Sequence, residues 1–93
     1  MKDLITRSYN AISKRGLITD YTSNLEFLSK CKEELQECKQ ARFNEKHYIE
    51  ELTDLATVCI MNITHLGYDF ETEFEKVVRK NEQRAKQFNQ PVK

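Results

Sequence analysis

Residues that interrupt helices are almost absent from this chain. Its 93 residues include two glycines, Gly16 and Gly67, and one proline, Pro91. Elsewhere, apolar residues recur every three or four positions, which is the period of an amphipathic helix. The composition therefore predicts an all-α fold. The length predicts a single domain, residues 1–93, near the small end of what folds alone.

Four helical segments follow from the local signals. Gly16 and Gly67 are expected to end the first and third helices, because glycine is favoured just past a helix end. Ser23 and Glu26 form a capping-box pattern that opens the second helix, and Asp69 can cap the fourth. The expected segments are residues 2–14, a helix from Ser23 to a break near 43–46, residues 47–66 and residues 70–87. The third is apolar almost all round and is expected at the centre of the fold, and the tail after Phe88 is expected to fray.

Two acidic patterns stand out on the second and third helices. Glu33-Glu34-Leu35-Gln36-Glu37 reads E-E-x-x-E, and Glu51-Leu52-Thr53-Asp54 reads E-x-x-D, with 13 residues between Glu37 and Glu51. Residues three apart share one helix face. An antiparallel pair of helices would therefore gather four carboxylates: Glu34, Glu37, Glu51 and Asp54. Such a cluster repels itself without a cation, and its all-oxygen donor set suits Mg²⁺ or Mn²⁺.

The charges are balanced overall but unevenly distributed. Residues 33–54 carry seven acids and three bases, a balance of −4, and residues 76–93 carry six bases and one acid, a balance of +5. This layout fits a metal site beside an anion site, whereas a protein that binds nucleic-acid polymers is usually basic overall. No apolar run is long enough for a membrane span and the N-terminus has no signal-peptide pattern, so we expect no membrane partner and a cytoplasmic location.

The cysteines and histidines carry no clear functional signal. Cys31, Cys38 and Cys59 match no metal or redox spacing. They lie at apolar helix positions and are interpreted as reduced core residues. His47 is interpreted as a surface residue and His65 as a packed one.

Four segments together resemble the all-α nucleoside triphosphate pyrophosphohydrolases, the superfamily of the MazG-like proteins, the all-α dUTP and dCTP pyrophosphatases and phosphoribosyl-ATP pyrophosphohydrolase. The segments are Lys30-Cys31-Lys32-Glu33-Glu34-Leu35, Glu50-Glu51-Leu52-Thr53-Asp54-Leu55, Leu66-Gly67-Tyr68-Asp69-Phe70 and Lys80-Asn81-Glu82-Gln83-Arg84. The resemblance covers about residues 22–88. It departs from the family at Phe27, where a Gln is frequent, and in having no Trp, so it does not indicate how a base is recognised.

The resemblance implies a four-helix bundle assembled as a homodimer or tetramer, of the compact kind found in bacteria and phages. It implies Mg²⁺-dependent, or Mn²⁺-dependent, cleavage between the α- and β-phosphates of a nucleoside triphosphate. The implied metal ligands are Glu34, Glu37, Glu51 and Asp54. Glu33 or Glu37 would act on the attacking water, and the implied substrate-binding residues are Lys30, Lys80, Asn81 and Arg84. The alternatives are a non-catalytic helical interaction module that retains the fold and a small regulatory or antitoxin-like helical protein.

Overall fold

Every regular element among residues 1–88 is an α-helix. The structure, a computed structural model, describes residues 1–88. The helices are α1 (Lys2–Lys14), α2 (Asn24–Ala41), α3 (Glu45–His65) and α4 (Phe70–Phe88). The all-α prediction is therefore confirmed, and the predicted boundaries agree to within about two residues. The predicted fraying after Phe88, and Lys93 of the basic segment, lie outside the described residues.

Local hydrogen bonds explain where the helices begin. The Ser23 hydroxyl accepts from the Glu26 amide at 3.2 Å, and the Glu26 carboxylate accepts from the Ser23 amide at 2.6 Å, which completes the capping box of α2. The Asn44 side chain accepts from the His47 amide at 3.2 Å and caps α3. Each of these bonds satisfies a backbone donor that the first turn of a helix leaves free.

The two glycines end the helices that precede them. Gly16 and Gly67 have φ angles of +79° and +89°, a conformation that side chains with a Cβ disfavour. After α3, the Gly67 amide donates to the Thr64 carbonyl at 2.9 Å and the Tyr68 amide donates to the Ile63 carbonyl at 3.2 Å. These two bonds give hydrogen-bond donors to carbonyls in the last turn of α3, which is the usual role of a glycine cap at the end of a helix.

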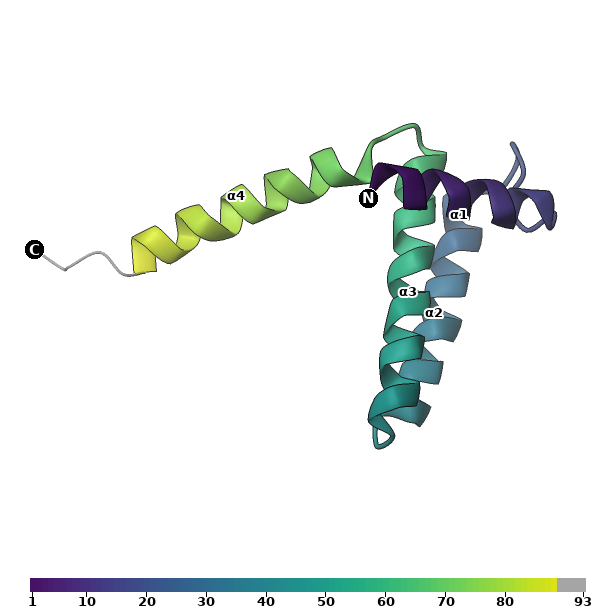
Figure 1. The fold of residues 1–93 in the computed structure, drawn as a ribbon, viewed down its shortest axis with the longest axis horizontal. Coiled ribbons are helices and arrows are strands. Elements are labelled where there is room, and N and C mark those ends of the chain that lie inside the picture. Colours follow the sequence, from purple (N-terminus) through teal and green to yellow (C-terminus); the bar gives the residue numbers. More distant parts are fainter. Residues whose placement is uncertain (89–93) are drawn as a thin grey trace, which may run out of the picture.

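A hairpin of α2 and α3 forms the body of the molecule, and α1 crosses its end (Figure 1). Ile18, Phe27 and Met61 form a buried cluster there, and Ile5, Tyr9 and Ile12 of α1 pack against it. Besides pairing with α2, α3 contacts both α1 and α4, as expected for a central helix. This cluster lies at one end of the hairpin, and the opposite end, where the chain turns at residues 42–44, is free of α1 (Figure 1).

His65 joins three parts of this core. Its Nε2 donates to the Thr22 carbonyl at 3.0 Å. When the ring is neutral, its one proton is therefore on Nε2, and Nδ1 accepts from the Tyr9 hydroxyl at 2.9 Å. The ring also packs on Phe27, with 5.3 Å between ring centres. The interpretation of His65 as a packed residue is confirmed.

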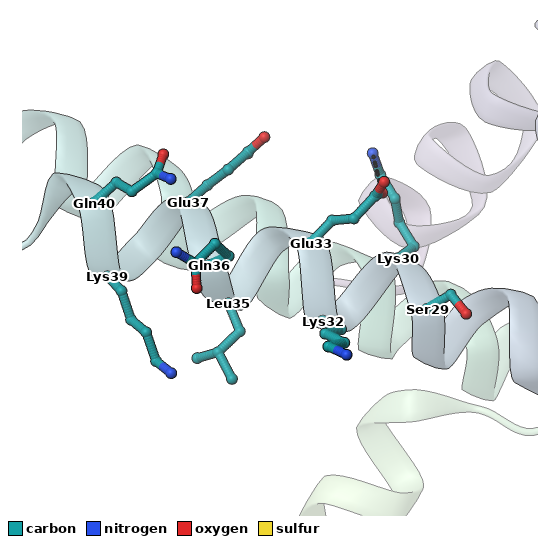
Figure 2. A pocket seen from close by; sticks show the side chains of 9 residues that line it. All are labelled: Ser29, Lys30, Lys32, Glu33, Leu35, Gln36, Glu37, Lys39 and Gln40. Atoms are coloured by element: carbon teal, nitrogen blue, oxygen red, sulfur yellow. Dashed lines mark ion pairs between the residues drawn. The ribbon is translucent and has the colours of Figure 1, made fainter.

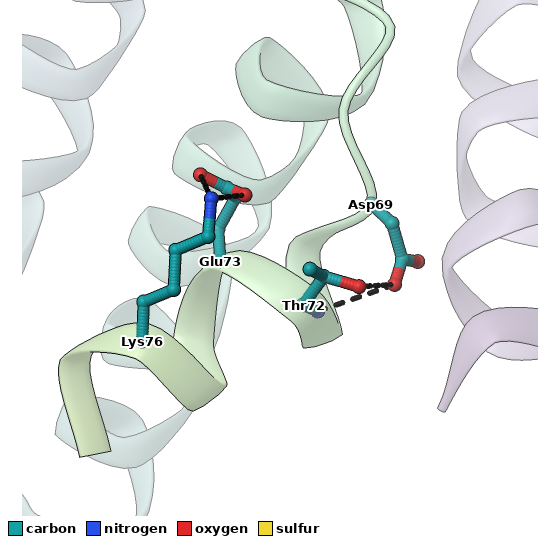
Figure 3. A network of polar contacts seen from close by, with 4 residues as sticks. All are labelled: Asp69, Thr72, Glu73 and Lys76. Carbon is teal, nitrogen blue, oxygen red and sulfur yellow. Dashed lines mark hydrogen bonds and ion pairs between the residues drawn. The ribbon is translucent and has the colours of Figure 1, made fainter. Parts of the chain in front are cut away.

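Helix α4 leaves the hairpin and extends away from it (Figure 1). It starts at Asp69, whose carboxylate accepts from the Thr72 amide at 3.2 Å and from the Thr72 hydroxyl at 2.7 Å, and an ion pair of 2.9 Å joins Lys76 to Glu73 in the next turn (Figure 3). No residue of α4 is buried. Within one chain the helices therefore do not close into a four-helix bundle.

The single chain is correspondingly extended. The Cα radius of gyration is 16.7 Å, whereas a compact chain of 93 residues would have a radius of about 12 Å.

No helix among residues 1–88 is long and apolar enough to cross a membrane.

The cysteines only partly follow the expectation from sequence. Cys38 is buried, Cys31 is half-buried and Cys59 is exposed. The interpretation as a core residue is thus confirmed for Cys38 and wrong for Cys59. Residues at apolar positions of α3 are covered only where α1 or α2 packs on them, and Cys59 lies at the edge of the α2 contact.

Candidate metal centre

Three of the predicted carboxylates converge between α2 and α3. Glu34, Glu37 and Glu51 each offer an oxygen, and these oxygens lie within 4.8 Å of one another. Glu34 and Glu37 are one turn apart on α2, and Glu51 faces them from the antiparallel α3. The spacing in sequence and the hairpin geometry together produce this acidic cluster, by which we mean Glu34, Glu37 and Glu51.

Asp54 lies outside the acidic cluster. Its side chain is exposed and is not part of the group of converging oxygens. Its charge nevertheless acts on the same region, as the buried Cys38 thiol shows. Burial is the main cause that raises the pKa of this thiol, and the negative charges of the acidic cluster and of Asp54 raise it further. Asp54 therefore adds to the negative potential of the site without sharing its centre.

Two oxygens of the acidic cluster are buried and have no hydrogen-bond partner among the described residues. They are Oε2 of Glu34 and Oε2 of Glu51. Glu34 is 7% exposed, so bulk solvent has little access to its carboxylate. A buried carboxylate oxygen without a partner costs free energy, and nearby carboxylates add repulsion. A cation between the two helices would remove both costs.

The electrostatics of Glu34 agree with this geometry. Burial raises the pKa of the Glu34 carboxyl, the charge of Glu37 raises it further, and Lys30 acts in the opposite direction. The Lys30 ammonium lies 3.4 Å from carboxylate oxygens of both Glu33 and Glu34. A hydrogen bond to Glu33 is the main reason that the pKa of Lys30 is raised. One lysine therefore offsets only part of the charge on this side of the cluster.

His47 is a neighbour of the cluster that the sequence reasoning did not identify. Its Nε2 lies 3.2 Å from Glu51 Oε1, and its side chain is 56% exposed. The residue is on the surface, as interpreted, but it faces a carboxylate of the site. The signal in the sequence was the spacing of four residues between His47 and Glu51, which places both on one helix face.

An open pocket of about 470 Å³ lies beside the acidic cluster at the turn between α2 and α3. It is lined by Glu37, Gln40, Ala41, Asn44, His47 and Glu51. Two residues of the cluster therefore face a space that a small ligand can enter. The buried Glu34 does not line this pocket.

The outer face of α2 holds the predicted residues Lys30 and Glu33. Both are exposed and project on the same side of the helix as Glu37, whereas Lys32, Leu35 and Lys39 project on the other (Figure 2). The surface hollow at this place is lined by residues of α2 alone. Lys30 and Glu33 thus lie next to the acidic cluster and on its solvent side.

The other predicted substrate-binding residues are elsewhere. Lys80, Asn81 and Arg84 are exposed residues of α4, which runs away from the hairpin (Figure 1). The structure of one chain does not bring them to the carboxylates.

The acidic cluster fits a hard divalent cation. Its donors are all carboxylate oxygens, which Mg²⁺ and Mn²⁺ prefer. Mg²⁺ usually keeps several waters and takes one or two carboxylates together with phosphate oxygens, so a partly open cluster suits it. The two unpartnered buried oxygens are the structural observation that supports this fit.

Comparisons of the chain with protein-family models, with curated proteins and with solved structures give no match.

Proposed function

We propose that the protein is a Mg²⁺-dependent nucleoside triphosphate pyrophosphohydrolase. It would hydrolyse the bond between the α- and β-phosphates of a nucleotide, releasing the monophosphate and pyrophosphate, and Mn²⁺ could replace Mg²⁺. The observation that carries the proposal is the convergence of Glu34, Glu37 and Glu51 within 4.8 Å from two helices. The sequence resemblance to the MazG-like superfamily supplies the reaction.

The carboxylates would have distinct roles in this reaction. Glu34, Glu37 and Glu51 would hold the cation, and Asp54, on the same helix as Glu51, would add negative charge from outside this group. When bound, a divalent cation offsets phosphate charge and lowers the pKa of a coordinated water. Glu33 or Glu37, both at the solvent side, would accept the proton of the attacking water.

Lys30 would bind the triphosphate. Its ammonium is held 3.4 Å from Glu33 and Glu34 and its side chain is 56% exposed, so it can exchange a carboxylate for a phosphate oxygen. A cation on Glu34 would favour this exchange, because the carboxylate would then need less charge from Lys30.

The proposed functional unit is a homodimer, or a tetramer of dimers. Helix α4 buries no residue, although most helical stability in proteins comes from packing of an amphipathic face against another element. Its apolar face is open to solvent, as are apolar side chains along the hairpin. The exposed residues are Leu25, Leu28, Leu35, Ile49 and Leu52 of the hairpin and Phe74, Val77 and Val78 of α4. Covering these surfaces would supply the apolar burial that one chain lacks.

Charge complementarity favours a second copy of this chain as the partner. The residues from 33 to 54 have a balance of −4, and residues 76–88 of α4 carry one acid, Glu82, and five bases: Lys76, Arg79, Lys80, Arg84 and Lys86. If α4 of one copy packs along the hairpin of the other, opposite charges meet. That arrangement would also bring Lys80, Asn81 and Arg84 to the acidic cluster of the second copy, where they could bind phosphate.

The activity is tested by incubating the protein with a panel of canonical and damaged nucleoside triphosphates and measuring pyrophosphate and orthophosphate separately. We expect pyrophosphate from at least one nucleotide, only with Mg²⁺ or Mn²⁺. Glu34→Gln, Glu37→Gln and Glu51→Gln should each lower the rate by about two orders of magnitude, because each removes charge that the cation needs. Glu50→Gln is the matched control, since Glu50 is exposed and lies outside the cluster. Orthophosphate as the first product, or full activity in EDTA, would refute the proposed reaction.

The assembly is tested by light scattering and by mixing variants. We expect a species larger than the 11.1 kDa chain, and Phe74→Asp should dissociate it, because a charge would enter the apolar interface. If α4 completes the site of the second copy, a mixture of Glu34→Gln and Arg84→Ala should regain part of the activity that each lacks alone. A monomer at high micromolar concentration would contradict the assembly.

The same experiments distinguish the enzyme from the alternative, a non-catalytic helical interaction module. An assembled protein that binds no divalent cation and hydrolyses no nucleotide would favour the interaction module over the enzyme.

A further inference from the structure

Cys31 and Cys59 face each other across the contact between α2 and α3. Their sulfur atoms are 3.9 Å apart, although the residues are 28 positions apart in sequence. Cys31 is half-buried and Cys59 is exposed. The third thiol, that of Cys38, is buried elsewhere on α2 and is 3% exposed. The protein thus holds one pair of contacting thiols with an open side.

We propose that Cys31 and Cys59 form an oxidisable dithiol that closes to an intramolecular disulfide between α2 and α3. A disulfide needs about 2.0 Å between its sulfurs, so the two atoms must approach by about 2 Å. Rotation about the Cα–Cβ bond of one cysteine moves its sulfur by more than this. The gap between the two sulfurs is therefore within the reach of a side-chain rotation.

The oxidant would be a peroxide, and it would react first with Cys59, which is the exposed thiol of the pair. Burial, and a hydrogen bond with Cys59, raise the pKa of the Cys31 thiol and so disfavour its reactive thiolate. The Cys59 thiolate would attack one peroxide oxygen, the O–O bond would break, and the leaving oxygen would take up a proton as water. This step leaves a sulfenic acid on Cys59.

The second step uses the neighbouring thiol. The Cys31 sulfur would attack the Cys59 sulfur, the S–O bond would break, and the departing hydroxide would take the Cys31 proton to form a second water. In sum, two thiols and one peroxide give one disulfide and two waters, and two electrons pass from sulfur to oxygen. Cys38 takes no part, because its sulfur is not in contact with either partner among the described residues.

The cross-link would lie beside the acidic cluster. Cys31 precedes Glu34 by one turn on α2, so the disulfide would tie α2 to α3 close to the carboxylates. It would also constrain the unfolded chain and thereby stabilise the hairpin. The inference rests on the thiol contact alone and does not require the proposed enzymatic function.

The test treats the folded full-length protein with hydrogen peroxide, blocks remaining thiols with an alkylating agent in denaturant and measures the intact mass. We expect the wild type to lose two hydrogens and to retain one alkylated thiol, with peptide mapping joining Cys31 to Cys59. The oxidised protein should melt several degrees higher, and a reducing agent should reverse both changes.

Single serine variants provide the controls. Cys38→Ser should still form the cross-link and retain no alkylated thiol, whereas Cys31→Ser and Cys59→Ser should not form it. In Cys31→Ser, a sulfenic acid should persist on Cys59 and be trapped by dimedone. Three alkylated thiols after oxidation of the wild type, or a disulfide between two chains on a non-reducing gel, would overturn the inference.

Discussion

Replacing Glu34 by Gln should make the metal-free protein more stable. The change keeps the shape of the side chain and removes a charge that lies within 4.8 Å of carboxylate oxygens of both Glu37 and Glu51. Two unit charges 4.8 Å apart repel by about 1 kcal/mol in water and by about 3.5 kcal/mol at an effective dielectric constant of about 20. The variant also loses the partly exposed ion pair with Lys30, which is worth up to about 1 kcal/mol.

The net gain should be about 1–2 kcal/mol in the free energy of unfolding, equivalent to a rise of roughly 5–10 °C in melting temperature for a domain of this size. The assay is thermal and urea unfolding followed by circular dichroism in EDTA, at one protein concentration because an assembly makes the melting temperature concentration-dependent. Adding Mg²⁺ or Mn²⁺ should reverse the order, since a cation that binds only the native cluster stabilises the wild type more than the variant.

Glu33→Gln is the matched control for Glu34→Gln. Glu33 also pairs with Lys30, at the same 3.4 Å, but it is exposed and lies outside the acidic cluster, so its melting temperature should change little. A Glu34→Gln protein that is less stable than wild type in EDTA would show that the buried carboxylate is favourably solvated, and the cluster would then not need a cation.

Three further measurements test other parts of the structure. Because the pKa of Glu34 is raised in the folded protein, the native state binds the Glu34 proton more tightly than the unfolded chain does. In EDTA, the stability that this group contributes is therefore present below its ordinary pKa and is lost as pH rises through the folded pKa. Urea titrations between pH 4.5 and 8 should show this decline in wild type relative to Glu34→Gln, and parallel curves would contradict it. Titration calorimetry with Mn²⁺ should give a loss of affinity on the order of tenfold or more for Glu51→Gln and a smaller loss for Asp54→Asn. The difference is expected because only Glu51 belongs to the converging group, and equal losses would place Asp54 in the site. Ser23→Ala should destabilise the fold by about 1 kcal/mol in urea unfolding, since it removes the hydroxyl that accepts from the Glu26 amide at 3.2 Å, and an unchanged midpoint would mean that α2 does not need its cap.

The sequence by itself determined the helices and the faces on which the acids lie. Helix ends depend on short-range hydrogen bonds and on backbone conformation, and Ser23, Gly16 and Gly67 supply these within a few residues. The spacing of three residues between Glu34 and Glu37 likewise put both on one side of α2. Such features need no knowledge of a distant segment, so they could be predicted.

Only the tertiary structure decided which of these residues meet. Sequence spacing treated Asp54 as equal to Glu51, but the position of α3 against α2 brings Glu51 to Glu34 and leaves Asp54 exposed. The contact of Cys31 with Cys59 depends in the same way on how the two helices pack. The direction of α4 could not be predicted from the sequence either. Its amphipathic pattern indicates an apolar face that would be buried against another surface, but not whether that surface belongs to the same chain. Distances across a helix pair are set by the packing of all intervening side chains, and no local pattern encodes them.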